Sequence, residues 1–162
     1  MSHFVPGPDT AQQFRSALSR FATGVTVVTC RSKLGPLGIT ANSFASVSLD
    51  PPLVLWSPAK SSSRHDAFVQ ADRFVIHVLD ETQTALCSQF TKDGLDFTGL
   101  EIDELSGGVP LIKGCMAHFE CTPFNTHDAG DHTIVVGRVE TAFARDGAPL
   151  VFSGGSLGTF SG

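Results

Sequence analysis

Two long segments with strand composition dominate the last third of the chain, residues 116–124 and 133–144. Each is rich in β-branched and aromatic residues. The polar stretch His127-Asp128-Ala129-Gly130-Asp131-His132 connects them. Two neighbouring strands of this length are expected to pair with each other. This pairing favours a fold built on a β-sheet.

The rest of the chain supplies further short strands and few helices. Strand composition recurs at residues 25–30, 39–44, 53–56 and 74–79. Helical spacing is found after the predicted cap Asp9-Thr10, with Gln13 as its capping-box partner, and again at residues 65–69, after Ser62 or Ser63 as cap, and 82–90. Residues 92–114 are rich in Gly and Asp and are predicted to be a long loop. The prediction is a mainly β fold with short helices, a closed antiparallel barrel.

Length and charge limit the classes of function. The chain has 162 residues, of which 41% are hydrophobic and 17% charged, as expected for one domain over residues 1–162 with a flexible N-terminal arm over residues 1–9. A net charge of -5 disfavours a nucleic-acid partner. With no signal peptide and no apolar stretch of membrane-span length, we expect a soluble cytoplasmic protein with no membrane partner.

Several common motifs are absent or misleading. Cys30, Cys87, Cys115 and Cys121 have no CxxC spacing and are predicted to be buried, reduced thiols. No segment matches GxGxxG or the Walker phosphate loop. Residues 154–158 match the GxSxG elbow of serine hydrolases, but no acidic residue or histidine follows them, so the match is interpreted as accidental.

The histidines of the connecting stretch allow three interpretations. His127 and His132, with Asp128 and Asp131, could converge on a divalent cation, although the spacing is not diagnostic. The stretch could instead be a polar connection. A third interpretation places a histidine beside a ligand, as a hydrogen-bond donor that titrates near neutral pH. We predict no metal site.

Polar side chains interrupt one of the strands and follow another. Thr40, Asn42 and Ser43, with Ser46 and Ser48 beyond them, lie where a purely structural strand would prefer Val or Ile. Either this strand faces solvent at a sheet edge, or its polar groups contact a ligand. Ser57 and residues 60–64, which include Lys60 and Arg64, stand between a strand and a helix, where hydroxyls, N–H groups and a cation can hold a phosphate.

Long blocks of the chain resemble the short-chain flavin reductase family. The first includes residues 14–29 and residues 40–54, with the run Thr-Ala-Asn-Ser at its centre. The second is His127-Asp128-Ala129-Gly130-Asp131-His132-Thr133-Ile134 with Gly137-Arg138-Val139-Glu140. Their order and separation also fit, and they extend over residues 14–152.

The resemblance implies an FMN-binding split barrel, usually a homodimer, that reduces FMN or FAD with NADH or NADPH, commonly for a separate flavin-dependent monooxygenase. It places the flavin ring beside Thr40, Ala41, Asn42 and Ser43, its phosphate beside Ser57, Lys60, Ser61, Ser62 and Ser63, and implies a further contact at Phe90. It assigns Gly130, Asp131 and His132 to the nicotinamide side, with His132 as the catalytic residue. Such a reaction needs no nucleophile, because the cofactors carry the hydride chemistry.

Three segments depart from the family pattern: Asp96-Phe97-Thr98-Gly99 lacks its basic residue, Trp56 stands where smaller residues are usual, and the tail after Val151 is small and uncharged. Two other functions remain open on the residues alone. One is a flavoprotein of the same fold that keeps FMN tightly bound and reduces another acceptor, such as a corrinoid or a metal complex. The other is a binding module that carries flavin or haem without turnover.

Overall fold

The structure is a computed structural model that describes residues 3–160. Within that range the fold is mainly β, as predicted, with a few short helices. The α-helices are α1 (Ala11–Leu18), α2 (His65–Val69) and α3 (Thr84–Lys92). Short 3-10 turns occupy Pro8–Thr10 and Ser106–Gly108.

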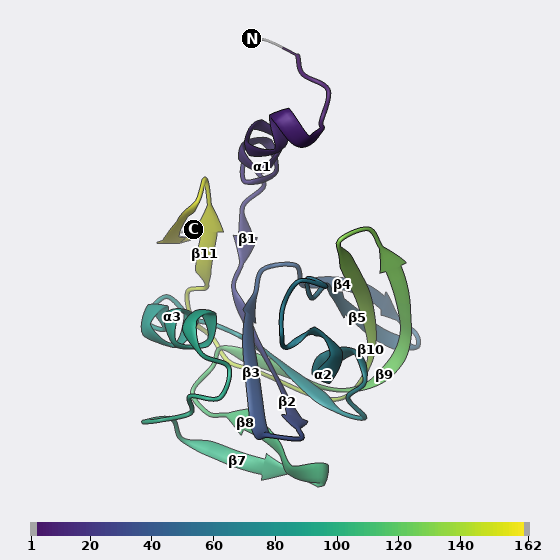
Figure 1. Ribbon diagram of the computed structural model, residues 1–162. Helices are drawn as coiled ribbons and strands as arrows, with labels where there is room; N and C mark the ends of the chain where they lie inside the picture. Colours follow the sequence, from purple (N-terminus) through teal and green to yellow (C-terminus); the bar gives the residue numbers. More distant parts are fainter. Residues whose placement is uncertain (1–2, 161–162) are drawn as a thin grey trace.

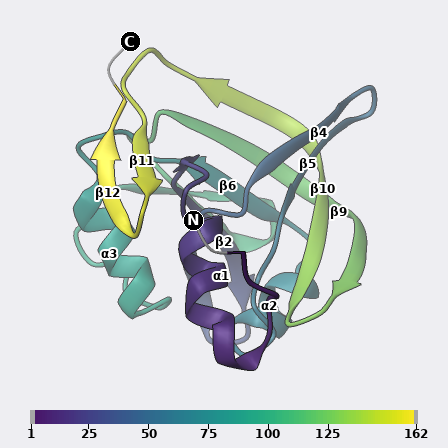
Figure 2. The ribbon, with the colours of Figure 1, turned by 90° about the horizontal axis from the view of Figure 1, so that it is seen from above.

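The main sheet, within residues 3–160, has seven strands in the order β3-β2-β6-β9-β10-β5-β4, and every neighbouring pair is antiparallel. In chain order its strands are β2 (Thr26–Ser32), β3 (Gly35–Ala41), β4 (Ala45–Leu49), β5 (Pro52–Trp56), β6 (Phe74–Val78), β9 (Ala117–Ala129) and β10 (His132–Ala144). The predicted pairing of the two long segments is confirmed as the β9–β10 hairpin, and β2 and β3 also form a hairpin. The strands β9 and β10 arch around the molecule (Figure 2).

The two edges of this sheet are consecutive in the chain. Strand β3 ends at Ala41 and β4 begins at Ala45, so residues 42–44 alone connect them. Four Cα steps span at most about 14 Å, so the sheet must curl until its edges come close together. No hydrogen bonds pair β3 with β4 in the described part of the chain. The predicted closure into a barrel is therefore not confirmed.

Two small sheets were missed by the sequence patterns. Strands β7 (Ile102–Leu105) and β8 (Val109–Ile112) form a hairpin inside the predicted long loop, which is a correction. Strands β11 (Leu150–Ser153) and β12 (Ser156–Thr159) pair with each other, and β11 also pairs with β1 (Thr23–Gly24). Gly154 and Gly155 both have positive φ at the β11–β12 turn, as a type I′ hairpin requires. The GxSxG match is thus a turn and a strand.

The buried apolar side chains form two clusters. One contains Trp56, with Phe68 of α2 edge-on at a ring-centroid distance of 5.1 Å. The other contains Phe90 of α3. Val28 belongs to the first cluster and Val27 to the second, so β2 is buried on both faces. This double burial explains its uninterrupted run of β-branched residues.

Helix α1 lies apart from the main sheet. Figure 1 shows it projecting away from the sheet, and none of its residues is buried. The predicted capping box is wrong: Thr10 makes no side-chain cap, and its hydroxyl donates instead to the carbonyl of Val5 at 2.7 Å. The predicted arm over residues 1–9 includes residues 1 and 2, which lie outside the described residues.

All four cysteines are free and buried, as predicted. Burial raises the pKa of Cys30 and Cys121 to about 12 and that of Cys115 to about 11. These thiols stay protonated at neutral pH. No helix within residues 3–160 is long and apolar enough to cross a membrane.

Candidate functional site

A cavity of about 410 Å³ lies between the end of β3, helix α3 and the β11–β12 hairpin. Three predicted flavin-contacting residues, Thr40, Ala41 and Asn42, line it. The other residues on its wall are Val25, Cys87, Ser88, Thr91, Lys92, Phe152 and Leu157. A cavity of this size is within the range of small-molecule sites.

The polar groups of the cavity fall into two sets. The Thr40 hydroxyl donates to the carbonyl of Cys87 at 2.7 Å, which fixes β3 against α3. The side chains of Asn42, Ser88 and Lys92 make no hydrogen bond or ion pair with another described residue. An amide, a hydroxyl and an ammonium group are therefore available to a ligand.

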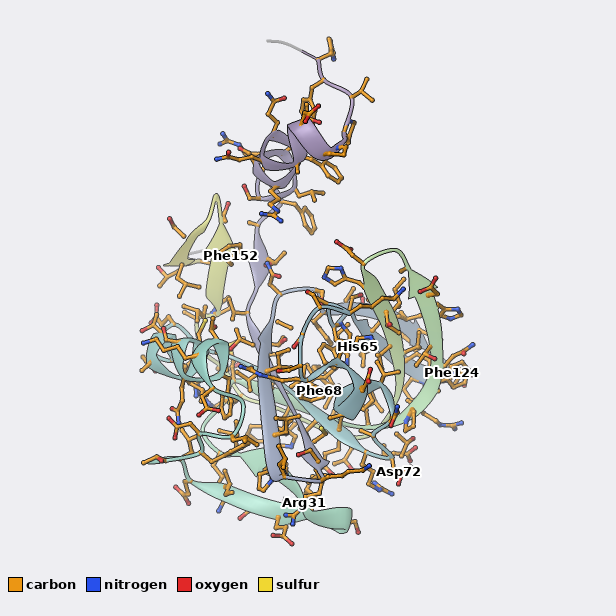
Figure 3. All side chains as sticks on the ribbon, in the orientation of Figure 1. Arg31, His65, Phe68, Asp72, Phe124 and Phe152 are labelled. Atoms are coloured by element: carbon orange, nitrogen blue, oxygen red, sulfur yellow. The ribbon has the colours of Figure 1, made fainter. Side chains whose placement is uncertain are left out.

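The other side of the cavity is lined by apolar side chains. Val25 is buried, and Phe152 of β11 lies beside β1, as Figure 3 shows. Leu157 completes this wall from β12. Apolar side chains with a few polar groups suit a flat heteroaromatic ring.

The residues from α3 were missed by the sequence-based prediction of the site. Within this helix Leu86, Cys87 and Phe90 are buried, whereas Ser88 and Lys92 are exposed. The helical spacing of apolar residues in a sequence predicts such an exposed polar face. The spacing does not indicate that β3 lies opposite that face, because this contact depends on tertiary packing.

Phe90 lies in the core and does not line the cavity. It is fully buried and meets Phe97 edge-on, with ring centroids 4.9 Å apart. A Cβ added to Gly38 would come within 2.5 Å of the Phe90 ring. Glycine at position 38 therefore allows β3 to pass directly over Phe90. The observed role of Phe90 is packing beneath the site, not the predicted direct contact.

The serine-rich segment 57–63 lies beside the link between the two sheet edges. The Ser57 N–H donates to the Ser43 hydroxyl oxygen at 2.9 Å, so Ser43 joins the two segments and does not line the cavity. The Ser62 hydroxyl oxygen accepts from the N–H of Arg64 at 3.2 Å. Arg64, not a serine, occupies the cap position of α2. The hydroxyls of Ser61 and Ser63 have no hydrogen-bond partner in the described chain.

A second cavity, of about 770 Å³, lies between the β2–β3 hairpin, α2 and residues 92–95. Ser63 is on its wall, and Lys92 lines both cavities. Arg64 also lines it and donates to the carbonyls of Gly38 and Phe90. This larger cavity holds one of the predicted residues, whereas the smaller holds three.

The predicted polar connection between the long strands is shorter than expected. Strand β9 continues to Ala129 and β10 begins at His132, so Gly130 and Asp131 alone form the turn. Gly130 has φ +66° at the first central position, and Asp131 has negative φ. This is the type II′ arrangement that requires glycine there.

His132 is held by its neighbour. The Asp131 carboxylate lies 2.7 Å from Nδ1 of His132 and accepts a hydrogen bond from it. This hydrogen bond lowers the pKa of Asp131. The Nε2 atom of the half-buried imidazole is left for a ligand. Among residues 3–160, no three His, Cys, Asp or Glu side chains are grouped to hold a metal ion.

The turn at Gly130-Asp131 contacts residues 58–60 of the serine-rich segment. Ala59 and His132 form an isolated β-bridge, and the N–H of Thr133 donates to the carbonyl of Pro58 at 3.1 Å. The predicted phosphate ligand Lys60 contacts Asp128 and Gly130. The structure thus makes residues 40–43, 57–63 and 130–132 contiguous.

Comparison with known proteins identifies relatives over almost the whole chain. The family model described as "Flavin reductase like domain" matches residues 18–161. An FMN reductase (NADH), SmoA, of Agrobacterium fabrum is 58% identical over 158 residues, which cover 98% of this chain and 91% of the relative. The reductase subunit HsaB of a flavin-dependent monooxygenase from Rhodococcus jostii is 38% identical, with 87% and 73% covered.

Solved structures also match. The NADH:FAD oxidoreductase SgcE6 of Streptomyces globisporus, in complex with NAD and FAD fragments, has a TM-score of 0.89 and 36% identity. The match covers 98% of each chain. The similarity therefore includes the candidate site as well as the sheet.

Proposed function

The chain belongs to the flavin reductase like domain family, and from this premise we propose that the protein reduces FMN or FAD with NADH and supplies the reduced flavin to a partner monooxygenase. It is an enzyme, an NADH-dependent flavin oxidoreductase. The observation that carries the proposal is the juxtaposition of the cavity at Thr40–Asn42, the hydroxyl-rich segment 57–63 and the turn bearing His132.

The residues of the site suit a flavin. The unpartnered amide of Asn42 can both donate to and accept from the polar edge of an isoalloxazine ring. Val25, Phe152 and Leu157 offer apolar contact to its faces. The free hydroxyls of Ser61 and Ser63 and the N–H groups beside them can hold a phosphate. A buried Thr23 hydroxyl without a partner lies on β1, the neighbour of β11.

This division of roles needs no nucleophile. A bound flavin supplies the N5 atom that accepts hydride from a dihydronicotinamide, so the chemistry belongs to the two nucleotides. Residues 40–42 would orient the ring, and residues 57 and 61–63 would hold the phosphate. His132 would hold the nicotinamide in place or stabilise negative charge on the reduced ring through Nε2. The protein contributes mainly proximity and orientation.

A steady-state assay tests the function. NADH consumption by the purified protein is followed by absorbance with FMN, FAD, riboflavin or no added flavin, and NADPH replaces NADH in a parallel series. We expect NADH oxidation that rises with added FMN or FAD. Tightly bound flavin without nucleotide oxidation would instead identify a binding module, and oxidation that needs a different acceptor would identify a flavoprotein of the second kind.

We also propose that the curled sheet forms a split barrel in one domain, whose gap lies between β3 and β4, and that the protein works as a cytoplasmic homodimer. Phe14, Leu18 and Phe21, on and after α1, are 42%, 58% and 79% exposed. An isolated helix shorter than about 12 residues is marginal in water, so α1 needs a covering surface. A second copy of the chain would provide it.

A further inference from the structure

Lys60 is engaged by the turn that carries His132. Its ammonium group donates to the Asp128 carboxylate and to the carbonyl of Gly130, the latter at 2.7 Å. Its backbone N–H donates to the carbonyl of Asp131 at 2.9 Å. Lys60 therefore contacts the carbonyls of both central residues of the turn, as well as Asp128, which lies two residues before Gly130.

These contacts restrain the turn at its tip. The bridge between Ala59 and His132 and the hydrogen bond from the Thr133 N–H to the Pro58 carbonyl hold the start of β10 through the backbone. His65 Nε2 also lies 2.7 Å from the Thr133 hydroxyl. The tip has one side-chain restraint from this segment, which is Lys60. Asp128 holds the ammonium group in the position from which it reaches Gly130.

The energy of the ion pair indicates what it does. The side chains of Lys60 and Asp128 are 40% and 82% exposed. An exposed pair of this kind adds little to the free energy of unfolding. Such a contribution is too small to decide whether the domain folds. The ion pair instead affects the position of the turn, and His132 is the first residue after that turn.

We propose that Asp128 is a positioning residue that acts through Lys60: together they hold the Gly130-Asp131 turn so that His132 faces the pyridine nucleotide. The pair also connects the flavin-side segment 57–63 to the nicotinamide-side turn. The inference rests on the proposed function and deepens it. It gives Lys60 a role as a clamp instead of the predicted role as a phosphate ligand.

The two roles of Lys60 predict different effects of Asp128→Asn on the NADH step. Removing the carboxylate charge leaves the ammonium group free. If Lys60 served the phosphate, flavin affinity would hold or improve and the NADH step would be unchanged. If Lys60 instead holds the turn, loss of its interaction with Asp128 loosens the turn. The NADH step is then impaired and flavin affinity is unchanged.

The experiment compares Asp128→Asn, Lys60→Met, their combination and the conservative Lys60→Arg with wild type. Glu101→Gln and Lys113→Met are matched controls. Their side chains form an ion pair with similar exposure, but it lies at the β7–β8 hairpin and not at the turn that carries His132. KM and kcat are measured separately for NADH and FMN, and FMN affinity is measured by fluorescence quenching without NADH. Amide hydrogen exchange of Lys60 in the flavin-free protein provides a readout that is independent of turnover.

We expect Asp128→Asn and Lys60→Met to impair the NADH step, in KM or kcat, by about 2- to 5-fold. FMN affinity should stay within about 2-fold, and the double variant should be no worse than the worse single variant, because both remove one interaction. Lys60→Arg should retain most of the activity. Exchange of the Lys60 amide should accelerate in Asp128→Asn and not in the controls.

Two results would overturn the inference. One is weakened FMN affinity in Lys60→Met with a normal NADH step, which would make Lys60 a phosphate ligand. The other is wild-type behaviour of Asp128→Asn in both the kinetics and the exchange. If wild type itself reduced no flavin with NADH, the proposed function would fail, whereas the exchange data would still report on the clamp.

Discussion

At the scale of single residues, the Asp131–His132 pair shows how a two-residue turn prepares a functional group. The carboxylate accepts a hydrogen bond from Nδ1–H, which orients the imidazole and leaves Nε2 free. Gly130 supplies the positive φ that the first central position of this two-residue turn requires. A side chain held by its neighbour in this way is suited to positioning rather than to nucleophilic attack.

Replacing His132 with Ala should slow hydride transfer and spare flavin binding. A hydrogen bond to a charged group is worth about 1.5–3 kcal/mol, so the single-turnover rate should fall about 10- to 100-fold. Stopped-flow absorbance measures the rate, and flavin fluorescence measures affinity. Lost flavin binding together with an unaltered rate would show that the assigned role is wrong.

His77 makes a second prediction at this scale, for stability instead of activity. It is fully buried, with Nδ1 3.0 Å from the Val27 carbonyl, while Nε2 accepts from the N–H of Ile112 at 2.9 Å. Burial lowers the pKa of His77 from 6.5 to about 4; the bond to Val27 opposes this shift, and the nearby His118 adds to it. The unfolded chain therefore binds a proton more readily than the folded chain between pH 4 and 6.5.

The free energy of unfolding should thus decrease as the pH falls from 6.5 towards 4. His77→Leu should be less stable at pH 7, since two buried backbone groups lose their partners at about 1–3 kcal/mol. Its further loss of stability in acid should be smaller than that of wild type. Urea unfolding followed by the fluorescence of Trp56 gives both slopes, and equal slopes would refute the assignment to His77.

At the scale of elements, the sequence patterns predicted the strands that are buried on both faces and missed the exposed strands. The strands β2, β5 and β6 have continuous β-branched or apolar runs because both of their faces are buried, so composition alone identifies them. Strands β7 and β12 are mostly exposed and rich in polar residues and glycine. Their pairing follows from turn geometry and partner position, which local periodicity does not encode.

The candidate site shows the same division. Thr40, Ala41 and Asn42 could be predicted because hydroxyls and an amide in a strand are unusual, and the resemblance located the turn at His132. Ser88 and Lys92 could not be predicted, because only the fold places α3 beside β3. Phe90 was assigned to the ligand although it packs below Gly38, since an aromatic residue looks the same in a sequence whether it contacts a ligand or the core.

Helix α1 makes the prediction at this scale. Aspartate in place of Phe14 and Leu18 should convert a dimer into a monomer, because the substitutions place charges on the apolar face that a second copy would bury. Light scattering during size-exclusion chromatography measures the mass. Leu34→Asp, at an 80% exposed position in the β2–β3 turn, is the control that should leave the dimer intact. A monomeric wild type would contradict the proposed assembly.

At the scale of the whole molecule, one topological fact organises the site. The edges of the seven-stranded sheet are joined by residues 42–44, so the curl of the sheet brings the end of β3 to the segment that follows β5. The turn of the β9–β10 hairpin contacts the same segment, because Ala59 bridges to His132 and the Lys60 N–H donates to the Asp131 carbonyl. Three segments that are distant in the sequence meet there because the sheet curls.

A crystal structure of the protein with FMN tests this account most directly. We predict electron density for the isoalloxazine ring against Thr40, Ala41 and Asn42, with the phosphate beside the serines of residues 57–63 and His132 near the exposed face of the ring. Flavin bound elsewhere on the molecule, or a cavity at Thr40–Asn42 that stays filled by solvent or by its own side chains at saturating FMN, would contradict it.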